Sequence, residues 1–177
     1  MITIYFESHG TTTDNEQKLA SGHYDVELSQ LGEAQAKELG KRYREVELDT
    51  VFCSDMQRAY RTGEIAFNGR KLAILKDKRL RECDYGDDTR RPETEVKLDK
   101  PNHITEPFPN GESYEQVVAR MKDFLEHIKK NYEGKTVMII GHRGTQYGLD
   151  HLVNGEDLKD AIVKPWKWQP GWKYELK

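Results

Sequence analysis

Apolar residues gather in four short runs along the chain, and each run is too short for a typical buried helix. The runs cover residues 2–6, 51–53, 72–75 and 136–140. They are rich in β-branched and aromatic side chains, which pack well on a pleated sheet. A polar, turn-forming or helix-capping segment follows each of them. We therefore interpret all four as buried strands.

The segments between these strands repeat apolar or small residues at helical spacing. Ser29 is a good N-cap for one helix, and its inner face is predicted to contain Gly32, Ala36, Leu39, Gly40 and Tyr43. Ser113 and Gln116 form a capping-box pattern before a second helix. The apolar stripe of that helix is Val117, Met121, Phe124, Leu125 and Ile128.

The remaining segments give weaker patterns. Ser54 and Gln57 predict a capped helix directly after the second strand, and residues 145–153 predict a short helix. The tryptophan-rich tail is interpreted as a closing strand at the sheet edge. The order strand, helix, strand predicts an α/β fold, a three-layer sandwich with a mostly parallel sheet, in one domain over residues 1–177.

Composition narrows the class of protein. The chain has 177 residues with 36% hydrophobic and 33% charged residues, and its mean hydropathy is −0.89. A net charge of −3 argues against a nucleic-acid binder, and no apolar stretch reaches the roughly 20 residues of a membrane span. Cys53 and Cys83 have no metal-ligand spacing. With no signal-peptide pattern at the start, we expect a cytoplasmic protein with reduced thiols.

Two of the predicted strands are each followed by a histidine. The next residue is a glycine in one case and an arginine in the other. His9 follows the first strand and His142 follows the last. Parallel strands deliver their carboxyl ends to one edge of a sheet, where ligand sites form in open α/β folds. The pattern favours a site with two imidazoles, although each histidine alone is equally well explained as an ordinary loop residue.

Arg58 occupies an unusual place in the first turn of the helix after residue 53. The positive end of the helix dipole disfavours a cation there and attracts phosphate. A bound anion would compensate for this misfit. An ion pair with Asp55 is the alternative, whereas Arg61, one turn later, is expected to face solvent.

These residues resemble the motifs of the histidine phosphatase superfamily, in its phosphoglycerate-mutase-like branch. That family has Arg-His-Gly-x-Thr after its first strand, Ser-x-x-x-Arg-Ala-x-x-Thr after the next, a Leu-x-Glu, and a late Gly-His. The matching segments here are His9–Thr12 with Asn15, Ser54–Thr62, Leu80–Glu82 and Gly141–His142. The resemblance covers nearly the whole chain.

The resemblance implies a role for each site residue. His9 would attack phosphorus and form a phosphohistidine, and Arg58 and His142 would bind the phosphoryl oxygens. Glu82 would protonate the leaving oxygen and then activate water. Asn15 would help to bind phosphate, with a role as a turn former as its alternative. Neither a metal ion nor another cofactor is implied.

Ser8 departs from the family pattern, which has arginine at this position. Three outcomes are open: Ser8 donates one hydrogen bond in a slower enzyme, Arg143 supplies the missing charge, or the site binds phosphorylated ligands without turnover. Glu7 is a second oddity, expected to pair with Arg58 or Arg143 or to point away. Because the four catalytic positions are intact, the enzyme interpretation is favoured.

We expect hydrolysis of a small phosphorylated metabolite, because the family's mutases carry extra length. The alternatives are a weak or inactive phosphatase-like binding module, a mutase-type phosphotransferase, and a nucleotide-binding doubly wound domain, although no glycine-rich nucleotide motif is present. Substrate determinants are expected in residues 87–110, which lack clear periodicity. The basic residues of that segment are Arg90, Arg91, Lys97, Lys100 and His103. Neither the substrate nor the oligomeric state can be read from the sequence.

Overall fold

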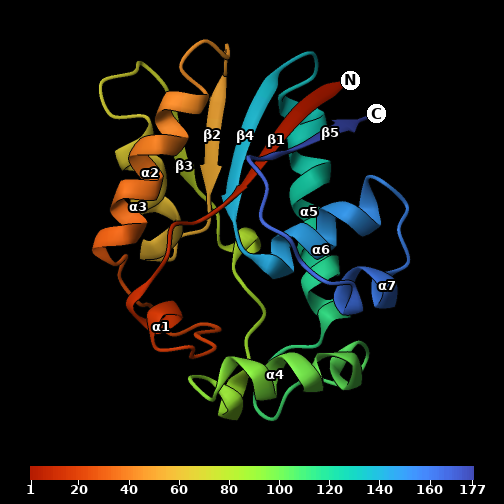
Figure 1. Ribbon diagram of the computed structural model, residues 1–177. Coiled ribbons are helices and arrows are strands. Elements are labelled where there is room, and N and C mark those ends of the chain that lie inside the picture. Colours follow the sequence, from red (N-terminus) through yellow and green to blue (C-terminus); the bar gives the residue numbers. More distant parts are fainter.

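The computed structural model describes all 177 residues and contains each predicted strand (Figure 1). The strands are β1 (Ile2–Ser8), β2 (Thr50–Cys53), β3 (Ala73–Lys76), β4 (Thr136–Gly141) and β5 (Trp172–Leu176). They form one sheet in the order β3-β2-β4-β1-β5. The first four are mutually parallel, and β5 pairs antiparallel with β1. The expected mostly parallel sheet is confirmed.

Helices cover both faces of this sheet, which gives the three-layer sandwich expected from the sequence. In Figure 1, α2 and α3 lie on one side, and α5 and α6 lie on the other. The helices are α1 (Thr13–Glu16), α2 (Gln30–Arg42), α3 (Gln57–Ala66), α4 (Glu93–Asp99), α5 (Tyr114–Asn131), α6 (Arg143–Leu152) and α7 (Leu158–Val163). Short 3-10 turns lie at Lys78–Leu80, Gly86–Asp88 and Lys100–His103.

Each face of the sheet has its own apolar core. Phe6 and Ile139 pack with Phe124 of α5 on one face, and Val51 and Met138 pack beneath α2 and α3 on the other. A third cluster, beyond the carboxyl ends of the strands, joins α4, α5 and α7. The predicted stripe of α5 is buried throughout.

Two of the predicted helix caps are confirmed and one is wrong. Ser29 accepts from the Gly32 amide, and Ser113 forms a capping box with Gln116. Ser54 does not cap α3, which begins three residues later with Met56 at the N-cap position and no side-chain cap. The Ser54 hydroxyl instead lies 2.6 Å from His142 Nε2. Ser54 therefore contacts His142, which follows the neighbouring strand β4, instead of capping the helix next to it in the sequence.

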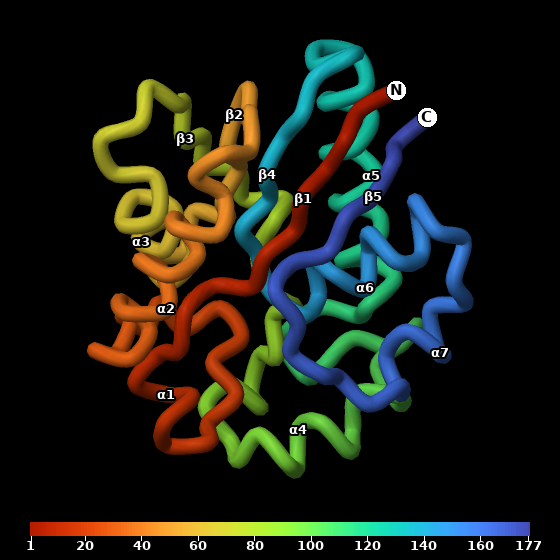
Figure 2. Tube along the Cα trace, turned by 45° about the horizontal axis from the view of Figure 1, so that its top comes forward, coloured from red at the N-terminus to blue at the C-terminus, as the bar shows by residue number.

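Three other segments differ from the expectation. Residues 87–110 contain α4, whose seven residues present a single buried side chain, Val96, and so give little periodicity. Helix α6 begins at Arg143, directly after β4, rather than at residue 145. The closing strand is limited to Trp172–Leu176, so Trp166 and Trp168 lie before it. Figure 2 shows the two chain ends side by side, as the pairing of Ile2 with Leu176 requires.

Two glycines bring α2 against the loop that follows β1. A side chain at Gly32 would lie 2.0 Å from the Thr11 carbonyl oxygen, and one at Gly10 would lie 2.5 Å from the Gly32 carbonyl oxygen. Only hydrogen fits at both positions, so the loop rests directly on the helix backbone. None of the helices combines the length and the hydropathy that a membrane-spanning segment requires.

Candidate active site

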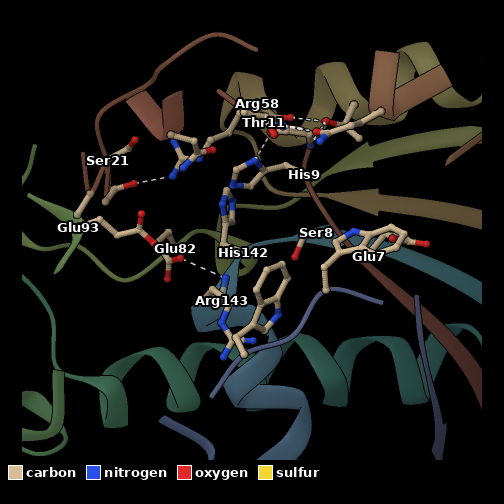
Figure 3. A pocket seen from close by; sticks show the side chains of 18 of the residues that line it. Glu7, Ser8, His9, Thr11, Ser21, Arg58, Glu82, Glu93, His142 and Arg143 are labelled. Atoms are coloured by element: carbon tan, nitrogen blue, oxygen red, sulfur yellow. Dashed lines mark hydrogen bonds between the residues drawn. The ribbon is translucent and has the colours of Figure 1, made fainter. Parts of the chain in front are cut away.

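A cavity of about 900 Å³ opens at the carboxyl ends of β1 and β4 and contains the predicted catalytic residues. His9, Arg58, Glu82 and His142 all line it, together with Ser8, Asn15 and Arg143. Strand order explains why these residues lie together, because β1 and β4 are neighbours and β2 lies beside β4. Figure 3 shows the two histidines side by side, with Arg58 close to His9.

The ring of His9 is held in one tautomer. Its Nδ1 lies 2.7 Å from the Gly10 carbonyl oxygen, which can only accept a hydrogen bond. Nδ1 therefore carries the proton, and Nε2 keeps its lone pair. Burial, together with the nearby Arg58 guanidinium, lowers the pKa of His9 to about 4. The ring is neutral at pH 7 and able to act as a nucleophile.

His142 lies 5.0 Å from His9, measured between ring centroids, and is almost fully buried. Burial, with Arg58 and His9 as further causes, lowers its pKa well below the usual range. Ser54 Oγ contacts Nε2, whereas Nδ1 has no hydrogen-bond partner in the protein. A buried polar atom without a partner is costly, so Nδ1 is a candidate contact for a ligand.

Arg58 is buried in the first turn of α3, as predicted, with 2% of its surface exposed. Its guanidinium donates to the carbonyl oxygens of Gly22, at 2.7 Å, and Tyr24, at 3.0 Å. The alternative pairing with Asp55 is wrong, because Asp55 is bound by Arg81 at 2.6 Å. Two neutral carbonyls orient Arg58 without cancelling its charge, which leaves that charge for an anion.

Glu82 is held by backbone amides. Its Oε1 accepts from Cys83 and Gly144, both at 2.8 Å, and its Oε2 accepts from Arg143 at 3.1 Å. A side chain at Gly144 would lie 2.6 Å from Oε1, so this close approach requires glycine. The exposed-carboxylate alternative for Glu82 is wrong: 9% of the residue is exposed.

Arg143 does not direct its guanidinium at the histidines. It donates to Gln146 at 2.6 Å and lies over the rings of Tyr147, at 4.7 Å, and Trp166, at 5.5 Å. The electrostatic influence on His9 comes from Arg58 and Glu82 instead. The expectation that Arg143 replaces the charge missing at Ser8 therefore gains no support from its position.

Glu7 and Asn15 are both engaged within the protein. Glu7, which is buried, pairs with Arg42 of α2 at 3.0 Å, so neither predicted partner binds it. Asn15 accepts from the Thr12 amide and closes the first turn of α1 while it lines the cavity. Its turn-forming role is therefore real, and its surface still faces the site.

Lys100 emerges as a site residue that sequence analysis named only as one of five basic residues. It lines the cavity without any ion pair or hydrogen bond, and its Nζ lies 5.6 Å from the Tyr147 ring and 5.9 Å from the Tyr85 ring. Burial opposes its charge, but Tyr85, Tyr147 and Glu82 raise the pKa of Lys100. Arg90, Arg91 and His103 are instead paired with carboxylates.

One cluster of potential metal ligands lies outside this cavity. Ligand atoms of Asp88, Asp99 and His103 lie within 4.8 Å of one another. The His103 ring already contacts Asp99 and stacks on Phe108 at 3.8 Å. Those contacts account for its position without a metal.

The arrangement of His9, Arg58, Glu82 and His142 can be compared with known proteins. The sequence model that defines the histidine phosphatase superfamily (branch 1) matches residues 4–161 of this chain. The chain belongs to the histidine phosphatase superfamily. Its resemblance to this superfamily, first seen in the motifs, is thereby confirmed.

Several members of this superfamily resemble the chain along most of its length. It is 31% identical to the uncharacterized phosphatase PhoE of Bacillus subtilis, over 89% of this chain and 80% of that protein. It is 38% identical to the fructose-2,6-bisphosphatase TIGAR of Xenopus tropicalis, over 68% of this chain and 47% of that protein. The structure of Bacillus stearothermophilus YhfR has a TM-score of 0.83 at 29% identity and covers 96% of this chain and 88% of that one.

Proposed function

We propose that the protein hydrolyses phosphomonoesters of small metabolites through a phosphohistidine formed on His9. Membership of the histidine phosphatase superfamily supports a metal-independent phosphoric monoester hydrolase. The observation that carries the assignment is the neutral, half-buried His9 ring, whose Nε2 lone pair is free beside Arg58. That is the state an imidazole nucleophile needs.

The reaction balances in two displacements. In the first, His9 Nε2 attacks phosphorus, the bond to the ester oxygen breaks, and a proton from Glu82 goes to the departing alcohol. In the second, Glu82 takes a proton from water, and the water oxygen attacks phosphorus. The phosphorus–nitrogen bond then breaks, which restores the His9 lone pair and releases inorganic phosphate.

The oxygens of the phosphoryl group need positive charge and hydrogen-bond donors in the transition state. We assign Arg58 and Nδ1 of His142 to them, because the first is an uncompensated buried cation and the second is unpartnered. Ser54 supports this assignment: when its hydroxyl donates to Nε2, Nδ1 of His142 carries the proton. Ser8 adds at most one neutral donor, which predicts a slower enzyme than one with a guanidinium at this position.

The similar proteins are named for different phosphorylated substrates. Among the relatives are phosphatases named for phosphoserine and for fructose 2,6-bisphosphate, and a probable phosphoglycerate mutase. We place this chain with the hydrolases and expect a small phosphorylated substrate, with neither nucleic acid nor membrane as a partner. Cys53 and Cys83 are buried free thiols, which favours a cytoplasmic location.

The first experiment is hydrolysis of p-nitrophenyl phosphate from acidic to neutral pH by the wild type and by His9→Ala. We expect activity in the wild type and its loss in the variant, with a phosphoenzyme trapped at low pH only in the wild type. An exposed histidine, His127, provides the matched control as His127→Ala.

A non-catalytic binding module is the second candidate, favoured by the absence of arginine at Ser8. Equal inactivity of the wild type and His9→Ala, combined with thermal stabilisation of the wild type by phosphate, would establish that candidate and refute the hydrolase. Activity that persists in His9→Ala would instead refute His9 as the nucleophile.

A further inference from the structure

The segment 164–171, here called the strap, runs from α7 to β5 beside the end of β1 (Figures 1 and 2). It has no regular secondary structure, and it forms one wall of the catalytic cavity through Lys164, Trp166 and Trp168. All three tryptophans of the chain lie in residues 166–172. The reaction described above uses none of them.

The strap exposes a large apolar surface at the cavity. Trp168 is 62% exposed and Trp166 is 40% exposed, and Leu31 of α2, which lines the same cavity, is 53% exposed. Exposed apolar side chains that gather in a cleft indicate a binding surface. A ligand that covers them would remove apolar surface from water, which favours binding.

Both indole rings are held by contacts within the protein. The Arg42 guanidinium lies 5.8 Å from the Trp168 ring centre, and the buried carboxylate of Glu7 fixes that arginine. Trp166 stacks on Trp172, with the ring centroids 6.4 Å apart and an interplanar angle of 28°. Ring orientation is therefore set before a ligand arrives, which reduces the entropy lost on binding.

The backbone of the strap is also fixed where it joins β5. Gly171 has a φ of +84°, and a side chain there would lie 2.2 Å from the Tyr43 hydroxyl and 3.0 Å from Glu7 Oε1. The strap thus rests on the same Glu7 that orients Arg42. Glu7, which sequence analysis could not explain, becomes the point where β1, α2 and the strap meet.

We propose that the strap and α2 form a subsite for the alcohol part of the substrate, and that this part carries a planar aromatic ring. The inference rests on the proposed function, since it places that ring on the leaving group of the phosphomonoester. A cavity of about 900 Å³ is far larger than a phosphoryl group needs. Flat indole faces favour aromatic rings by offset or edge-to-face packing.

The charge around Trp168 agrees with an uncharged ring rather than with a second anionic group. Arg42, which lies over Trp168, is compensated by Glu7 at 3.0 Å, and Lys164 of the strap is compensated by Glu156 at 2.6 Å. Glu38 lines the same wall and would repel an anion. The cavity cations without a carboxylate partner come from elements other than the strap and α2; they are Arg58, Lys97, Lys100 and Arg143.

The test uses two phosphonates, which resemble the phosphate ester but cannot be hydrolysed. Benzylphosphonate carries an aromatic ring and methylphosphonate does not. We expect calorimetry to show that the wild type binds benzylphosphonate about tenfold more tightly. Benzylphosphonate alone should change tryptophan emission, because every tryptophan lies in or directly beside the strap.

Variants separate stacking from a structural role of the strap. Trp168→Ala should lose most of the preference for benzylphosphonate and keep the affinity for methylphosphonate, whereas Trp168→Phe should retain the preference. Leu98→Ala is the matched control, since Leu98 is 82% exposed and lies outside the cavity. Equal weakening of both ligands in Trp168→Ala, or no preference in the wild type, would overturn the inference.

The outcome is independent of the hydrolysis assay. If the protein prefers benzylphosphonate but hydrolyses no ester, the aromatic subsite is supported and the proposed hydrolase is refuted. If hydrolysis requires His9 but the two phosphonates bind with equal affinity, the hydrolase is supported and the aromatic subsite is refuted.

Discussion

At the scale of single residues, the distribution of cations decides how this site can bind phosphate. A guanidinium is absent at Ser8, and Arg143 is engaged by Gln146 and two aromatic rings. Arg58 and Lys100 are cavity cations with neither a carboxylate partner nor a side-chain hydrogen bond to an amide. Burial lowers the pKa of the Arg58 guanidinium, so its charge costs free energy in the empty protein. That cost would be recovered when an anionic substrate enters.

Replacement of Lys100 should therefore separate activity from stability. We expect Lys100→Met to lower kcat/KM for p-nitrophenyl phosphate about 10- to 100-fold, the range for a lost charge-assisted contact. Its melting temperature should be nearly unchanged, because no ion pair is broken. Lys71→Met is the control, since Lys71 is exposed and outside the cavity. An unchanged kcat/KM in Lys100→Met would show that Arg58 alone supplies the charge.

At the scale of elements, the contact between Gly10 and Gly32 positions His9, the proposed nucleophile. The loop after β1 lies directly on the backbone of α2, so movement of the helix would carry His9 with it. Thr62 of α3 adds a second restraint, because its hydroxyl accepts from the Gly10 amide at 3.0 Å. His9 is thus placed by two helices as well as by its own strand.

A methyl group at position 32 should disturb this contact. We expect Gly32→Ala to destabilise the protein by about 1–3 kcal/mol, because the added atom would lie 2.0 Å from the Thr11 carbonyl oxygen. Turnover should fall by at least tenfold, since small displacements of a reacting group are costly. Urea unfolding and the aryl phosphate assay measure the two effects. Glu33→Ala, on the exposed face of α2, should change neither.

The elements themselves were largely predictable, and the exceptions have a common cause. Residues 2–6 formed an apolar run, and this strand buries Ile2, Ile4 and Phe6. The stripe of α5 gave clear helical periodicity because that helix buries one face over its whole length. Ser54 was misassigned as a helix cap because its actual partner, His142, is 88 positions away along the chain. Lys100 could not be selected from five basic residues for a similar reason. Its surroundings come from elements distant in the sequence.

At the scale of the whole molecule, the lowered pKa values of two imidazoles, His9 and His142, link stability to pH. The pKa of His9 is about 4 in the folded protein against 6.5 in an unfolded chain, so the unfolded chain binds more protons between these values. Stability present above pH 6.5 is therefore lost as the pH falls toward 4. His142 acts in the same direction.

We expect His9 alone to account for a loss of about 3 kcal/mol of unfolding free energy over this range. Urea unfolding at several pH values between 7.5 and 4.5 measures it. His9→Gln should show a smaller acid loss than the wild type, and His127→Gln, on the exposed face of α5, should match the wild type. If His9→Gln and the wild type lose stability in parallel, His9 is not buried as a neutral ring.

The sequence by itself determined the class of fold, the strands and the longer helices, and the candidate residues His9, Arg58, Glu82 and His142. Local patterns of apolar residues specify elements, and each candidate residue lies in a short motif. Only the tertiary structure decided the partners of these residues: Ser54 with His142, Glu7 with Arg42, and the strap beside the cavity. Such contacts join segments distant along the chain, and their energies depend on burial and strand order, which no local pattern contains.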